Sequence, residues 1–384
     1  MAAELRLFCG ADSLDALARE LKRSGCRRAV VISGQSVGKS SAMNLLRDAL
    51  GPLLAGQCTA VRSNSPVPAV EEAARGLAEL GADAVIAVGG GSAAVTARAA
   101  SILLAEKLPA QQLCTRRLPS GEFESPRLGA PKLPQFVVPT TPSTAFVKAG
   151  SAIHDPANGQ RLALFDPKTR AKGIFLHPQF LASSPSDLVR SASLNTLSTA
   201  VEALESPRCD PISQAMLMHS LRLIAQHLHS ESAQDIAGRE NLVLAAVLCG
   251  RGGDQSGGGL ASVLGHAIGH RSHVANGIVN AIVLAHTMRF NAPATRETSV
   301  RIADALRVTQ EPGGSHHAKP TQAVEAIEAL LLSVSVPRRL RDIGVAREDI
   351  APIADAAMSD WFIGRNPRPV SSVDEVRAIL EAAW

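Results

Sequence analysis

The sequence predicts an α/β domain with a mostly parallel sheet, followed by a separate helical domain. In the first half, short β-branched runs alternate with helical stretches, which is typical of parallel strands joined by helices on both faces of a sheet. From about Pro185 onward, helical periodicity dominates instead. A chain of 384 residues is long enough for two such domains, and we place them at 1–182 and 183–384.

The first domain is predicted element by element. Pro68 opens its second helix and Gly81 closes it, as these residues often do at helix ends. Residues 107–133 are rich in proline and polar residues and are expected to form a surface loop, whereas PANGQ (156–160) is expected to be a hairpin turn. The predicted strands are 29–33, 58–63, the apolar run in ADAVIAVGGGS (82–92), 134–141, 151–155 and 161–166, and the predicted helices are 40–50, 69–80 and 93–106.

The second domain consists of amphipathic and apolar helical segments. We expect Gly269 to interrupt one of them, because glycine is a poor helix former. The predicted helices are 188–206, 213–230, 239–250, 262–270, 277–291, 321–334 and 373–384.

Composition and charge exclude several classes of protein. Hydrophobic residues make up 46% of the chain and charged residues 19%, as in ordinary globular proteins. With 3% aromatic residues, no tyrosine and a dispersed net charge of +4, a nucleic-acid partner is not expected. The six cysteines form no CxxC pair, which favours a reducing cytoplasm. The sequence contains no apolar run of membrane-spanning length, and its N-terminus does not have the pattern of a signal peptide.

Two turns between a strand and a helix are candidates for phosphate binding. VGGGS (88–92) lets the backbone approach a pyrophosphate at a helix N-terminus, although a tight turn without a ligand would explain it too. SGQSVGKS (33–40) is similar to a P-loop, but it has three residues between its glycines where that motif has four, which disfavours a kinase or NTPase. The residues expected near phosphate are Gly89, Gly90, Gly91 and Ser92 in the first turn, and Gly34, Ser36 and Lys39 in the second.

A third cluster, VPTTPS (138–143), ends the fourth predicted strand. Thr140, Thr141 and Ser143 are placed to offer hydroxyls to a cofactor at the carboxyl end of a parallel sheet. A plain turn would also explain this composition.

The order of the motifs is more specific than any of them alone. VGGGS, VPTT, LALFDP (162–167), SLNTLSTAVEAL (193–204), GHAIGH (265–270) with NGIVNAIVLAHTMRFN (276–291), and LRDIGV (340–345) with NPRP (366–369) follow one another along nearly the whole chain. In this order and spacing the chain resembles the iron-containing alcohol dehydrogenase family. The resemblance implies a dehydroquinate synthase-like fold, an N-terminal dinucleotide-binding domain, a helical domain that usually carries a metal, a nicotinamide cofactor and a homodimer.

The family's metal ligands are an Asp, a His four residues later, and two further His residues. By resemblance, these four positions are Asn195, Thr199, Ser262 and Asn276 in this chain, all neutral where iron or zinc prefers imidazole, thiolate or carboxylate. His266 matches a family histidine that lies near the nicotinamide and does not bind the metal. We therefore expect no metal, with a substitute site of His266, His270 and His273 as the alternative.

One branch of the family is a partial precedent for these changes. Asn195 and the run Val201–Leu204 resemble maleylacetate reductases, which carry Asn at the position of the Asp ligand and lack the Asp that otherwise follows GGGS; here that residue is Val95. Those relatives keep histidines at the other ligand positions, and this chain does not.

The resulting hypothesis is a metal-independent, NAD(P)H-dependent oxidoreductase for a small carbonyl or enone. Hydrogen-bond donors would replace the metal in stabilising the substrate oxygen, and His266 would supply the proton. The expected donors are Asn195, Thr199, Ser262 and Asn276. Either NAD or NADP is compatible, since no acidic residue near Ser33 and Gly34 would repel a 2′-phosphate. The alternatives are a non-redox lyase or cyclase on the same fold and a catalytically inactive homologue.

Overall fold

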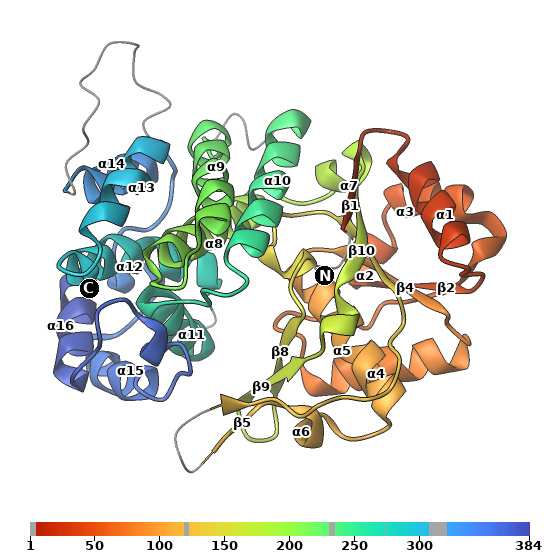
Figure 1. Cartoon of the computed structure of the whole chain (residues 1–384), viewed down its shortest axis with the longest axis horizontal. Helices are drawn as coiled ribbons and strands as arrows, with labels where there is room; N and C mark the ends of the chain where they lie inside the picture. The colour runs from red at the N-terminus through yellow and green to blue at the C-terminus, as the bar shows by residue number, and fades with distance from the viewer. Residues whose placement is uncertain (1–4, 119–122, 230–234, 273, 307–320) are drawn as a thin grey trace. The chain divides into compact units, whose positions relative to one another are not determined.

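The structure, a computed structural model, describes residues 5–118, 123–229, 235–272, 274–306 and 321–384, with the side chain of His270 excepted. It divides into two compact units, Met1–Ser184 and Pro185–Trp384, so the division falls two residues after the expected boundary. The first unit contains a parallel sheet with helices, and the second is helical (Figure 1). The predicted fold class is therefore confirmed.

Within the described residues, the main sheet of the first unit has six strands in the order β1-β10-β7-β4-β2-β3, and all its neighbours pair in parallel. Strands buried on both faces read as continuous apolar runs, which is why AVVIS and AVIAVG show no alternation. The strands are β1 (Arg6–Cys9), β2 (Ala29–Ser33), β3 (Leu54–Cys58), β4 (Ala84–Gly89), β7 (Gln135–Pro139) and β10 (Ala171–Leu176).

Helices cover both faces of this sheet (Figure 1). One apolar cluster joins α1 (Ser13–Arg23) and α3 (Ala42–Leu50) to Val31, Ile86 and Phe136. Because side chains alternate along a strand, Val30 and Ile32 of β2 point to the other face, where α4 (Val67–Glu79) and α5 (Gly91–Glu106) pack. The shorter elements are α2 (Gln35–Gly38), α6 (Ala110–Leu113), α7 (Pro178–Ala182) and the hairpins β5 (Arg116–Arg117) with β6 (Phe123–Glu124) and β8 (Gly150–Asp155) with β9 (Gln160–Phe165).

The strand prediction at 58–63 is wrong. Thr59 and Val61 favour a strand locally because they are β-branched. The parallel register with β2 instead runs from Ala29↔Leu54 to Ile32↔Cys58, and the pairing ends there.

Strands β1 and β10 lie outside the predicted set. They pair with each other from Arg6↔Gly173 to Cys9↔Leu176. A glycine inside AKGIFL weakens the local strand signal, yet a Cβ on Gly173 would lie 2.8 Å from the Phe175 ring, so the position has little room for a side chain.

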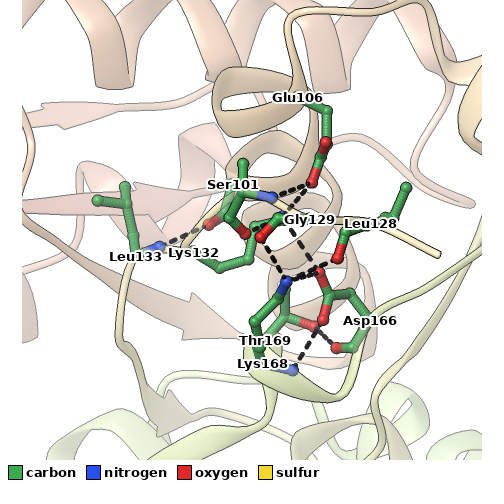
Figure 2. A network of polar contacts seen from close by, with 10 residues as sticks. Ser101, Glu106, Leu128, Gly129, Lys132, Leu133, Asp166, Lys168 and Thr169 are labelled. Carbon is green, nitrogen blue, oxygen red and sulfur yellow. Dashed lines mark hydrogen bonds and ion pairs between the residues drawn. The ribbon is translucent and has the colours of Figure 1, made fainter.

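The segment 107–133 is also more than the predicted surface loop. Leu113 of α6 is buried, and the side chain of Lys132 is fully buried. Figure 2 shows the polar network that holds Lys132 in place: its Nζ lies 2.5 Å from Glu106 Oε1, 3.1 Å from Asp166 Oδ2 and 2.6 Å from the carbonyl oxygen of Ala130. Glu106 is the last residue of α5, Lys132 lies just before β7, and Asp166 lies just after β9. The network therefore ties the chain that enters β7 to the ends of α5 and β9.

We expect Lys132→Met to lower the free energy of unfolding by about 3 kcal/mol, because it leaves two carboxylates close together without their cation. Urea denaturation measures this. Lys168→Met is the matched control: Lys168 lies 3.5 Å from the same Asp166, but its side chain is 41% exposed, and exposed pairs contribute about 1 kcal/mol or less. Equal effects of the two changes would contradict the assignment of Lys132 as the central cation.

The second unit is built from helices around one apolar core, to which α8 and α12 contribute Leu197, Val201 and Val283. Among the described residues, none of the helices combines the length and apolar character needed to cross a bilayer. The helices are α8 (Ser186–Glu205), α9 (Pro211–His227), α10 (Ile236–Gly252), α11 (Leu260–Ser272), α12 (Asn276–Asn291), α13 (Arg296–Leu306), α14 (Thr321–Leu332), α15 (Ile350–Ala357) and α16 (Val373–Ala383).

The predicted interruption at Gly269 is wrong, because α11 continues through it to Ser272. A Cβ on Gly269 would collide with the Asn276 carboxamide and lie 3.2 Å from the carbonyl oxygen of Val274. The glycine is therefore explained by the close approach of the chain beyond the helix rather than by a helix end.

Candidate active site

The glycine turn of the first unit lies between β4 and α5. Gly89 has φ +143°, a conformation that side-chain-bearing residues rarely adopt, and its carbonyl accepts a hydrogen bond of 3.1 Å from the N–H of Thr140. This bond ties the end of β4 to the end of β7. Gly90 then precedes the sixteen-residue helix α5 without any side-chain cap, so the N–H groups of its first turn could bind an anion.

The hydroxyl cluster after β7 lies against the same glycines. A Cβ on Gly90 would lie 2.5 Å from Thr141 Oγ1, and a Cβ on Gly91 would lie 2.7 Å from Ser143 Oγ. Two clusters that the sequence places about fifty residues apart are thus adjacent, and a side chain at either glycine would displace a hydroxyl.

The second turn lies at the same edge of the sheet. Ser33 at the end of β2 pairs with Val88 near the end of β4. Beyond it, Gly34 precedes the short helix α2, and the side chains of Ser36 and Lys39 are exposed. The expected phosphate-binding residues therefore lie at the carboxyl ends of β2, β4 and β7.

A buried arginine that the sequence analysis missed holds the hydroxyl-bearing segment. Arg98 of α5 is completely buried and donates to the carbonyl oxygens of Ala145 at 2.5 Å and Gly150 at 2.6 Å. Arg170 donates to the carbonyl of Val147 in the same segment at 2.7 Å. Burial and, to a smaller extent, the charge of Arg170 together lower the pKa of Arg98 to about 9. Two guanidinium groups thus position the chain that follows Ser143.

In the second unit, the four positions that the resemblance assigns to metal ligands lie on α8, α11 and α12, which pack against one another. The carboxamide of Asn195 is hydrogen-bonded to that of Asn280, with 3.1 Å between Oδ1 and Nδ2. Asn280 was missed, although its spacing of four from Asn276 places both on one face of α12. The Asn276 side chain is exposed and lies beside Gly269 of α11.

The two hydroxyls at these positions already donate their protons within the protein. Thr199 Oγ1 donates to the carbonyl oxygen of Asn195 at 2.7 Å, and Ser262 Oγ donates to Glu202 Oε2 at 2.5 Å. A hydroxyl has one proton to donate. In this arrangement Thr199 and Ser262 do not serve as the donors to substrate that the sequence analysis expected, and the two carboxamides remain for that role.

Glu202 also organises the start of α11. Its Oε1 accepts the N–H of Ser262 at 2.8 Å, and further bonds come from the N–H groups of Gly259 and Ala261. Burial raises the pKa of Glu202, while these hydrogen bonds oppose that rise. Glu202 lies in the VEAL run, and its functional signal was missed because a glutamate inside a helix is ordinarily a solvated residue.

Glu205, one turn further along α8, is buried as well. Asn291 Nδ2 donates to its Oε2 at 2.8 Å, and Asn366 is bonded to Asn291 with a distance of 2.6 Å. Burial, opposed by the hydrogen bond from Asn291 and reinforced by the neighbouring Glu202, raises the pKa of Glu205 to about 8. The polar layer beneath Ser262 therefore holds a carboxyl group that stays protonated at neutral pH.

His266 is held by a carboxylate. Its Nδ1 lies 2.8 Å from Asp360 Oδ2, and its ring centroid lies 5.8 Å from that of Phe362. Because a carboxylate accepts hydrogen bonds, Nδ1 carries the proton and Nε2 is the ring nitrogen that can exchange one with a substrate. The 94 positions between His266 and Asp360 explain why no local pattern revealed this pair.

Of the alternative site of His266, His270 and His273, the residue His273 and the side chain of His270 lie outside the described residues. Within the described part of the chain, no group of three or more His, Cys, Asp or Glu side chains has the arrangement of a metal site.

Comparison with known proteins identifies the family. Residues 5–178 match the family described as iron-containing alcohol dehydrogenase, and residues 190–384 match the C-terminal part of the Fe-containing alcohol dehydrogenase family. The chain belongs to this family.

The chain is 29% identical over 380 residues to lactaldehyde reductase of Escherichia coli (strain K12), covering 98% of this chain and 97% of that protein. It is 26% identical over 387 residues to maleylacetate reductase 1 of Cupriavidus pinatubonensis (strain JMP 134 / LMG 1197), covering 99% and 95%.

Solved structures agree on the fold. A 1,3-propanediol oxidoreductase superposes with a TM-score of 0.90 at 22% identity, covering all of both chains. Maleylacetate reductase from Agrobacterium tumefaciens superposes with a TM-score of 0.80 at 24% identity, covering 100% of this chain and 97% of that one. The predicted dehydroquinate synthase-like fold is confirmed, and the chain is a member of an oxidoreductase family.

The buried Glu205 generates a prediction on pH. Between its ordinary pKa of 4.5 and its folded pKa of about 8, the folded state keeps a proton that the unfolded state releases. Stability is therefore expected to fall as pH rises through this window, by at most about 1.4 kcal/mol per pH unit. Glu205→Gln keeps an acceptor for Asn291 and removes the titration, so urea denaturation should show a smaller loss of stability from pH 5 to pH 8.

The exposed Glu297, whose side chain is 89% accessible, is the control, since Glu297→Gln should keep the slope of the native protein. Parallel pH profiles for the native protein and Glu205→Gln would contradict the protonated state assigned to Glu205.

Proposed function

We propose that this protein is an NAD(P)H-dependent reductase of a small carbonyl or enone compound and that it works without a bound metal. The observation that carries the proposal is the His266–Asp360 pair, 2.8 Å apart, in the same helical unit as the carboxamides at two of the family's metal positions. Membership in an oxidoreductase family and the uncapped glycine turn of α5 support the nicotinamide cofactor.

The donor chemistry does not fit divalent iron. At the four positions stand two carboxamides and two hydroxyls, none of them charged at neutral pH, and iron and zinc bind imidazole, thiolate and carboxylate far better. The carboxamide of Asn195 is bonded to Asn280, and the hydroxyl of Ser262 is bonded to Glu202. The proposed mechanism therefore uses no metal.

The residues of the first unit fit a dinucleotide. The backbone of Gly90 and Gly91 can approach a pyrophosphate, because neither carries a Cβ, and the N-terminus of α5 favours its negative charge. Thr141 and Ser143 lie beside these glycines and can donate to the cofactor. A bound nicotinamide supplies the hydride. Nothing acidic among residues 33–40 would repel the 2′-phosphate of NADP, and Lys39 would favour it.

The residues of the second unit act on the substrate. As hydride reaches the carbonyl carbon, negative charge develops on the oxygen, and the N–H groups of Asn195 and Asn276 stabilise it by hydrogen bonding. His266 delivers the proton from Nε2, while Asp360 stabilises the ring when it is charged and keeps it oriented. Glu202 and Ser262 set the start of α11, one turn before His266.

Cofactor binding tests the proposal before any substrate is known. Titration calorimetry with NADH and NADPH should show binding of at least one, and a panel of short aldehydes, ketones and enones should then oxidise it. The absence of binding at millimolar concentrations would refute the reductase. Binding without turnover of any compound would favour a non-redox enzyme or an inactive homologue.

For the metal, we expect elemental analysis of the purified protein to find far less than one iron or zinc per chain. A chelator should leave both the melting temperature and the activity unchanged, because a metal bound by the native state would raise the melting temperature by mass action. One equivalent of metal per chain, with activity lost on its removal, would overturn the metal-independent mechanism.

For the proton donor, we expect His266→Ala to lower kcat at least tenfold, since general acid catalysis is typically worth about 10²–10⁴-fold. Cofactor affinity should change little, and the limb of the pH–rate profile near neutrality should disappear. Asp360→Asn should keep the fold and shift that limb, which a purely structural aspartate would not do. Full activity of His266→Ala with an unchanged pH profile would assign the proton to water.

A further inference from the structure

An arginine lies beside the His266–Asp360 pair without a described counter-charge. Arg365, at the end of the 3₁₀ turn Ile363–Arg365, has its guanidinium carbon 5.7 Å from the centroid of the Phe362 ring. The same ring lies 5.8 Å from the His266 imidazole. The imidazole and the guanidinium thus flank one aromatic side chain. Among the described residues, no carboxylate pairs with Arg365, in contrast to Arg368 nearby, which pairs with Glu375 at 3.0 Å.

The backbone beneath this arginine is shaped to receive it. Gly257 has φ +77°, and a Cβ there would lie 2.5 Å from Arg365 Nη1 and 3.0 Å from its Cδ. At the next residue, a Cβ on Gly258 would lie 2.8 Å from Cδ2 of Phe362. The consecutive glycines of GGG (257–259) therefore let the Arg365 and Phe362 side chains rest directly on the main chain. This contact restricts the guanidinium, so less side-chain entropy is lost when it binds a ligand.

A second arginine increases the positive charge at this place. Partial burial lowers the pKa of Arg365, and the charge of Arg208 lowers it further. Arg208 lies just beyond the end of α8 and is exposed. An anion bound at Arg365 offsets this repulsion between like charges.

We propose that Arg365 binds a carboxylate on the substrate, so that the substrate class is a small oxo acid rather than a neutral aldehyde or ketone. A planar guanidinium can hold a carboxylate through two parallel hydrogen bonds, which fixes both position and orientation. With the carboxylate on Arg365, the rest of the molecule extends along Phe362 toward His266. This inference rests on the proposed reductase for its chemistry, but the anion site itself can be tested separately.

The kinetic test compares two aldehydes of equal chain length, succinic semialdehyde and butanal. The native protein should show a kcat/KM at least tenfold higher for the acid. Arg365→Gln should lower the ratio of the two kcat/KM values at least tenfold, mainly through KM, and Arg365→Lys should restore part of it. Arg341→Gln is the matched control, since Arg341 also stacks on an aromatic ring, with 5.5 Å to Trp384, and its change should leave the ratio as in the native protein.

The binding test separates failure of the anion site from failure of the proposed function. Calorimetry with succinate should show binding to the native protein and none to Arg365→Gln, whether or not any aldehyde is reduced. Reduction of butanal without preference for the acid would overturn the substrate assignment and leave the reductase standing. Succinate binding that survives in Arg365→Gln, or inorganic phosphate binding as tightly as succinate, would overturn the carboxylate site.

Discussion

Close contact between α8, α11 and α12 is the constraint on which the candidate active site depends. Gly265 leaves room for the Asn280 carboxamide, Gly269 for that of Asn276, and Gly277 for the carbonyl of Ser191. Larger residues at these points would push the helices apart by more than a packed core tolerates. The close packing of these three helices therefore sets the distances between the polar side chains of the site.

Two buried carboxyl groups of α8 lie among neutral polar side chains and main-chain N–H groups. The buried carboxyl groups of Glu202 and Glu205 are stabilised by backbone N–H groups and by a carboxamide. Burial penalises their charged forms, and so one of them keeps its proton at neutral pH. The His266–Asp360 pair supplies the acid–base group of the proposed mechanism, and Arg365 contacts the same Phe362 ring as His266.

In the first unit, buried and partly buried arginines position the segment that follows the hydroxyl cluster. A segment that carries hydroxyls must lie close to a glycine turn, and Arg98 and Arg170 hold it there through main-chain carbonyls. The buried network of Lys132 fixes the opposite end of β7. Arg98, Arg170 and Lys132 of this unit thus each donate to main-chain carbonyl oxygens and hold the backbone in place.

The sequence by itself determined the fold class, most helices and the turns that meet at the carboxyl edge of the sheet, because apolar periodicity, glycine spacing and motif order are local properties of the chain. It did not determine the limits of β3 or the existence of β1 and β10, which depend on pairing between strands. It also could not decide which hydroxyls donate and to what, since the partners of Ser262 and His266 lie 60 and 94 residues away. Only the tertiary structure brings such residues within hydrogen-bonding distance, where protons are assigned by geometry and burial.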